Sequence, residues 1–102
     1  MWLLPPTTTT EASNSIAFEV HHDGVRKITL QNEAEQLNVA KLSRSKRELT
    51  VNIDVGTYRF EVEHQNKRWT TFLELTENTR VECQQAVESV ECTANNRMIQ
   101  WD

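Results

Sequence analysis

The chain has 102 residues, of which 37% are hydrophobic and 25% are charged, and its net charge is −4. This length suits one domain and is too short for two. A mildly acidic chain has no overall attraction to nucleic acid or to an anionic membrane, and no apolar run approaches the roughly 18 residues of a membrane-spanning helix.

Residues 1–15 precede the first strand-like pattern. Pro5 and Pro6 are followed by four threonines without apolar periodicity, which predicts a flexible, Thr-rich leader. A frayed terminus is the alternative. The start also lacks the basic region and the apolar length of a signal peptide, so export would require a leader that has been removed or replaced by Met1.

Residues 16–102 are expected to form one domain, and its first elements are two short strands. Apolar and polar residues alternate over residues 16–20, and a second apolar row follows in residues 25–30. We expect a hairpin whose three-residue loop ends at Gly24 and pairs Phe18 with Ile28. This register places both apolar rows on one face and a left-handed residue at Gly24.

Residues 32–44 have two readings. Asn32 with Glu35 three positions later resembles a helix capping signal. The alternation of Leu37 and Val39 instead favours a strand over residues 36–42, which we prefer because the surrounding segments are strand-like. A polar loop follows.

The second half alternates more regularly, over residues 49–55, 58–62 and 69–75. A hairpin between the last two segments places Val62 opposite Trp69, so that both apolar rows share the core face. Eleven residues are predicted to form the core: Phe18, Ile28, Leu30, Val51, Ile53, Tyr58, Phe60, Val62, Trp69, Leu73 and Val81.

Further short strands are expected around Cys83 and Cys92, and residues 98–101 can close a sheet. A turn at residues 77–79 is expected to place Asn78 in a left-handed conformation. Seven to nine strands at a spacing of about ten residues predict an all-β fold, an antiparallel β-sandwich.

One stretch, residues 49–83, resembles the PEGA and carboxypeptidase-regulatory-like modules. The similar features are the turn Gly56-Thr57-Tyr58 that opens a strand, the aromatic Trp69 and the strands that follow. The resemblance implies an immunoglobulin-like or transthyretin-like β-sandwich and an accessory, non-catalytic role outside the cytoplasm. Asp54 and Val55 stand where the family has prolines, so the resemblance supports the fold more than any function.

Cys83 and Cys92 are the most informative pair of residues. Eight residues separate them, so the two cysteines can lie directly opposite each other in an antiparallel hairpin, within disulfide reach. Gln85 would then face Val90. A disulfide would indicate an oxidising compartment, whereas two buried free thiols would fit the cytoplasm.

A basic segment lies between the predicted strands of the first half. It contains Lys41, Arg44, Lys46 and Arg47 and is a candidate patch for an anionic ligand. Charged loop ends are also common without any ligand.

Two further candidates are weighed against simpler explanations. The alternation along their strands places Tyr58 and Trp69 in the core. Trp101 is then the candidate exposed aromatic residue on which a sugar could stack. His21 and His22 point to opposite faces of a strand and cannot easily share a metal ion, so we interpret them as a polar hairpin end.

No catalytic, phosphate-binding or dinucleotide motif occurs, and we expect neither enzyme activity nor a cofactor. The sequence favours a non-catalytic binding or structural module that acts through a protein partner, at a cell surface or in an exported assembly. A sandwich has edge strands that can dock another strand. The alternatives are a carbohydrate-binding module and a cytosolic regulator that binds an anionic partner through the basic loop. We expect no nucleic-acid partner and no membrane insertion, and a periplasmic or secreted location.

Overall fold

The computed structural model describes residues 15–102, and within them every regular element is a β-strand. The predicted leader, residues 1–15, lies outside the described residues except for Ser15. The strands are β1 (Ser15–His22), β2 (Lys27–Asn32), β3 (Asn38–Ser43), β4 (Glu48–Asp54), β5 (Gly56–His64), β6 (Lys67–Leu75), β7 (Thr79–Ala86), β8 (Ser89–Ala94) and β9 (Arg97–Met98).

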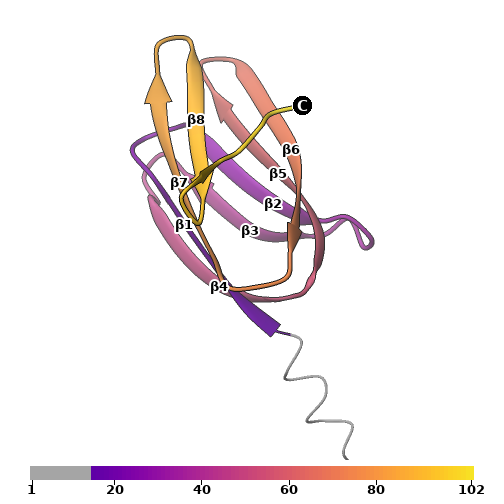
Figure 1. Ribbon diagram of the computed structural model, residues 1–102. Helices are drawn as coiled ribbons and strands as arrows, with labels where there is room; N and C mark the ends of the chain where they lie inside the picture. Colours follow the sequence, from indigo (N-terminus) through magenta and orange to yellow (C-terminus); the bar gives the residue numbers. More distant parts are fainter. Residues whose placement is uncertain (1–14) are drawn as a thin grey trace, which may run out of the picture.

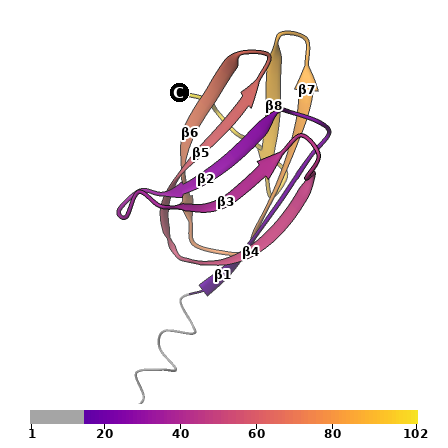
Figure 2. The ribbon, with the colours of Figure 1, turned by 180° about the vertical axis from the view of Figure 1, so that it is seen from behind.

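The strands form two sheets, one in front of the other (Figures 1 and 2). Sheet A has the order β4-β1-β7-β8-β9, and sheet B has the order β3-β2-β5-β6. Neighbouring strands are antiparallel, except that β1 and β7 run parallel. The predicted all-β fold with two largely antiparallel sheets, compatible with a β-sandwich, is therefore confirmed.

The predicted hairpin between the first two strands is wrong, because β1 and β2 lie in different sheets. Phe18 pairs with Val51 of β4, and Ile28 pairs with residues of β3 and β5. The physical reason is Val25, which is fully buried where the chain crosses between the sheets. The hairpin register would have placed Val25 on the face opposite Phe18. Gly24 allows this crossing because its φ is 127°, a backbone angle that residues other than glycine rarely adopt.

The strand reading of residues 36–42 is close to the observed β3, and the helix alternative is not found there. Asn32 does act like a cap, since its Oδ1 accepts a hydrogen bond from the Glu35 amide at 2.8 Å. Gln36 then adopts φ of 56°, which ends a tight turn instead of starting a helix. The inward row of β3 is Ala40 and Leu42 rather than the expected row that begins at Leu37.

The predicted hairpin of β5 and β6 is confirmed. Val62 pairs with Trp69, and Phe60 pairs with Thr71. The loop is a two-residue turn in which Gln65 and Asn66 both have positive φ, the geometry that matches the twist of paired strands.

The register predicted for β7 and β8 is also confirmed, since Cys83 pairs with Cys92 and Gln85 pairs with Val90. The turn before β7 differs in detail from the prediction. Asn78 does not have a positive φ. Its side chain shapes the turn instead, because Oδ1 accepts a hydrogen bond from the Ala17 amide at 2.9 Å.

The core lies between the sheets and contains eight of the eleven predicted residues as buried side chains. The other three, Val51, Trp69 and Leu73, are half-buried because they lie on the edge strands β4 and β6. Further buried residues were absent from the predicted core: Ile16, Val20, Val25, Ala40, Leu42, Leu75, Cys83, Val90, Cys92 and Ile99.

The C-terminal segment after β9 crosses from the edge of sheet A to the edge of sheet B (Figure 1). The Ile99 amide donates to the Cys92 carbonyl at 2.8 Å, and the Asp102 amide donates to the Thr70 carbonyl of β6 at 2.9 Å. Between them, the indole of Trp101 stacks on Phe60. This segment therefore covers one open side of the two-sheet structure.

Candidate functional site

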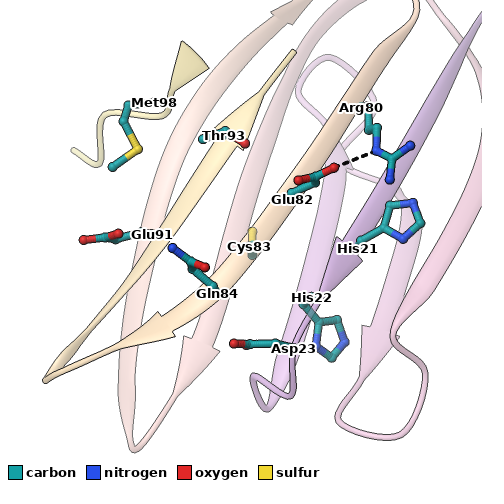
Figure 3. Close-up of a pocket in the computed structure, with 10 residues that line it drawn as sticks. All are labelled: His21, His22, Asp23, Arg80, Glu82, Cys83, Gln84, Glu91, Thr93 and Met98. Carbon is teal, nitrogen blue, oxygen red and sulfur yellow. Dashed lines mark hydrogen bonds and ion pairs between the residues drawn. The ribbon is translucent and has the colours of Figure 1, made fainter. Parts of the chain in front are cut away.

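The outer face of sheet A carries a depression of about 470 Å³. Alternation along β1, β7 and β8 turns a row of polar side chains outward, and ten residues line the depression (Figure 3): His21, His22, Asp23, Arg80, Glu82, Cys83, Gln84, Glu91, Thr93 and Met98.

An ion-pair network occupies one side of this depression. Arg80 Nε donates to Glu82 Oε2 at 2.8 Å (Figure 3). Arg80 Nη1 also lies 3.6 Å from Glu19 Oε2. Glu19 also accepts a hydrogen bond from His21 Nε2. The hydrogen bond from His21 and the charge of Arg80 hold the pKa of Glu19 below its usual value, against the smaller opposite effect of desolvation. These carboxylates are engaged with cations, so the geometry assigns no acid and base pair.

His21 and His22 point to opposite faces, as predicted, but His22 is not part of a polar hairpin end. It is buried, with Nδ1 accepting from the Gly24 amide at 3.0 Å. Its Nε2 faces the carbonyls of Ser43 at 3.0 Å and Lys46 at 2.9 Å. Since carbonyls only accept, Nε2 carries the proton, and the ring is engaged at both nitrogens. Within residues 15–102, no group of three or more His, Cys, Asp or Glu side chains could hold a metal ion.

His64 is also buried, near the end of β5. Neither of its ring nitrogens has a hydrogen-bond partner among the described atoms. The alternation of Tyr58, Phe60 and Val62 continues to His64, so the period of two was the sequence signal that could have placed this histidine on the inward face.

A second hollow, of about 400 Å³, lies where β2 and β3 run side by side (Figure 2 shows these strands). We call it the basic groove. Its cationic side chains are Arg26, Lys27, Lys41 and Lys46, and Leu42, Ser43 and Glu63 complete its lining.

The structure divides the predicted basic patch. Lys41 and Lys46 line the basic groove, whereas Arg44 and Arg47 do not. The Arg47 guanidinium lies beside Gly24, and its Nε donates to the Arg44 carbonyl at 3.4 Å.

Sequence reasoning missed Arg26 and Lys27 as members of this cluster. Lys27 joins it because it pairs with Ser43 across β2 and β3. The predicted pairing of residues 25–30 with the first strand hides this neighbour, which the observed pairing of β2 with β3 brings close.

Trp101 is half-buried rather than exposed. Its ring stacks on Phe60 with centroids 6.0 Å apart, and Nε1 donates to the Val90 carbonyl at 3.0 Å. The indole faces are therefore not an open platform for a sugar. Phe72, on the outer face of sheet B, is an aromatic residue that is exposed, at 52%.

The predicted disulfide is present and joins Cys83 to Cys92, with Cα atoms 4.1 Å apart. Both cysteines are buried, because they lie on the inward row of the β7–β8 hairpin.

No protein-family model matches the chain, and no curated protein has a significantly similar sequence. The part of the chain that the structure describes contains no helix long and apolar enough to cross a membrane.

Proposed function

We propose that the chain is a non-catalytic binding module that engages a protein partner by strand addition at β4. The single observation that carries this proposal is the free edge of β4. Within residues 15–102, this strand ends sheet A and pairs along its whole length with β1 alone.

The composition of β4 suits docking. Its charged residues, Glu48 and Asp54, lie at the two ends, and the five residues between them carry no charge. Leu49 and Val51 are half-buried on the side that faces the core. An unpaired and uncharged edge offers its backbone N–H and C=O groups for hydrogen bonds to another strand.

The other edges of the described sheets are less accessible. The Thr70 carbonyl of β6 already accepts the Asp102 amide. β9 has two residues, and the pairing of β3 shifts register opposite Leu30 and Gln31. Such short or irregular edges are a usual protection against unwanted strand pairing.

The strand order helps to choose between the two fold assignments that the resemblance implies. Immunoglobulin domains place their first two strands in one sheet and join the sheets by a disulfide. Here β1 and β2 lie in different sheets, and the disulfide lies within one hairpin. These differences support the transthyretin-like assignment, as in the regulatory-like modules that residues 49–83 resemble.

The disulfide supports an extracytoplasmic location, since such bonds persist in oxidising compartments. The cytosolic alternative predicts free thiols, which the Cys83–Cys92 bond does not favour. The carbohydrate alternative rests on Trp101, whose ring is engaged with Phe60.

The test is site-specific photo-crosslinking from Thr50, which is exposed on β4, in cells that produce the protein. We expect one dominant crosslinked protein. Val51→Lys should abolish the crosslink, because a charge beside the edge blocks strand addition. Thr57→Lys, which adds the same charge at an exposed position of β5, a strand that is paired on both sides, is the matched control and should retain it.

Amide hydrogen exchange with the purified partner provides the second readout. Residues 48–54 should exchange more slowly in the complex. A partner that binds the Val51→Lys protein equally well, or that protects the sheet A depression instead, would show that β4 is not the docking strand. Thermal unfolding checks that each variant is folded, and Leu49→Lys replaces Val51→Lys if it is not.

A further inference from the structure

Three of the four cationic side chains of the basic groove form no ion pair with another described residue, although Glu63 also lines the groove and lies opposite Lys27 across β2 and β5. Among residues 15–102, the ammonium groups of Lys27, Lys41 and Lys46 have no carboxylate oxygen within 4.0 Å. The arginines of the outer faces differ, since Arg59 and Arg68 have carboxylate partners at 3.3 and 3.1 Å.

Arg26, at the rim of the groove, is the exception among its cations, with Nε 3.6 Å from Glu63 Oε1. Three unpaired lysines thus converge on one hollow in a chain whose net charge is −4. Lys27 and Lys41 also lie diagonally across β2 and β3, where like charges repel. An anion between them would relieve this repulsion.

The backbone that carries Lys46 is held in place before any ligand arrives. The buried ring of His22 binds the carbonyls of Ser43 and Lys46, and the His22 amide donates to the Arg47 carbonyl at 3.0 Å. The Lys46 amide also donates to the Ser43 carbonyl at 3.1 Å. Binding therefore needs to order only lysine side chains, which lowers its entropic cost.

We propose that the basic groove is a binding site for a tetrahedral oxyanion, a phosphate or sulfate group carried on a larger molecule. Each lysine ammonium is a compact charge with three donors, which suits oxygens arranged around a tetrahedral centre. A planar carboxylate would instead favour the arginine fork, and Arg26 is engaged with Glu63. The volume of about 400 Å³ leaves room for the group that carries the anion. This site is independent of strand docking at β4.

The direct test is a titration of isotope-labelled protein with inorganic phosphate and with sulfate, followed by backbone amide NMR. Sodium chloride keeps the ionic strength constant. We expect saturable shifts at residues 26–28, 41–43 and 46. Shifts that grow linearly without saturation, or that spread over the whole surface, would overturn the proposal.

Charge-matched variants locate the site. Lys41→Gln and Lys46→Gln should each weaken phosphate binding about fivefold, as for the loss of one charge contact in water. Both residues are exposed, so the fold should persist. Lys67→Gln removes the same charge outside the groove and should leave the affinity unchanged. Equal weakening by Lys67→Gln would mean general charge attraction, and the site would be rejected.

O-phosphoserine and glucose 6-sulfate then distinguish the two sources of the anion. At least one should bind as tightly as its inorganic counterpart, and the tighter one identifies the natural class. If both bind more weakly than inorganic phosphate and sulfate, the groove does not accommodate a carrier, and the proposal fails.

Discussion

His21 and His22 are neighbours in the chain but have different roles, because adjacent residues of a strand face opposite sides. His21 faces the outer surface and contacts Glu19. His22 turns inward and connects the crossing at Gly24 with the basic loop through hydrogen bonds at both ring nitrogens.

We therefore expect His22→Ala to lower the free energy of unfolding by about 2 to 3 kcal/mol, because three backbone groups lose a buried partner. Urea denaturation of the purified protein measures this change. His21→Ala is the control on the same strand, and it should cost clearly less than His22→Ala, because His21 is half-exposed and loses only its contact with Glu19. Equal effects of the two substitutions would show that the buried hydrogen bonds of His22 contribute little.

At the scale of elements, the hairpin of β7 and β8 is closed covalently by Cys83 and Cys92. The double variant Cys83→Ala/Cys92→Ala should lose about 2.5 kcal/mol of stability on the chain-entropy estimate for a short loop. It should remain folded, because most of the core lies in the earlier strands.

Intact mass after alkylation decides whether the disulfide forms in the isolated protein. We expect no modified cysteine in native, unreduced protein and two after reduction. Two alkylated thiols in the unreduced protein would contradict the disulfide and remove the main support for an extracytoplasmic location.

Sequence patterns predicted the two hairpins that have local signals, β5–β6 and β7–β8. They failed for β1 and β2, whose alternation does not show whether the two strands lie in one sheet or in two. In the β5–β6 and β7–β8 hairpins, alternation on both sides of a short polar turn leaves one register that buries both rows. The apolar rows of β1 and β2 can be buried equally in one sheet or in two. The two-sheet arrangement buries Val25 in the crossing and pairs β1 with β4 and β7, which are distant in sequence.

At the scale of the whole molecule, the C-terminal segment links the two sheets through Trp101, which contacts Phe60 of β5 and Val90 of β8. Trp101→Ala should lower the free energy of unfolding by about 2 kcal/mol, less than for a fully buried tryptophan because the ring is half-exposed. Trp101→Phe keeps an aromatic ring but loses the hydrogen bond to Val90, and it should cost about 1 kcal/mol. Urea denaturation of both variants checks this order, and an unchanged stability in Trp101→Ala would mean that the segment does not brace the sheets.

The sequence by itself determined the all-β class, most of the strands, eight of the eighteen buried core residues and the Cys83–Cys92 pair, because these follow from alternation and spacing along the chain. The tertiary structure alone decided which strands share a sheet, which edge is free and which cations meet in the basic groove. Lys27 and Lys46 are separated in sequence and become neighbours of one hollow only when β2 pairs with β3. Such pairings depend on the burial of side chains from distant segments, and a local pattern does not contain that information.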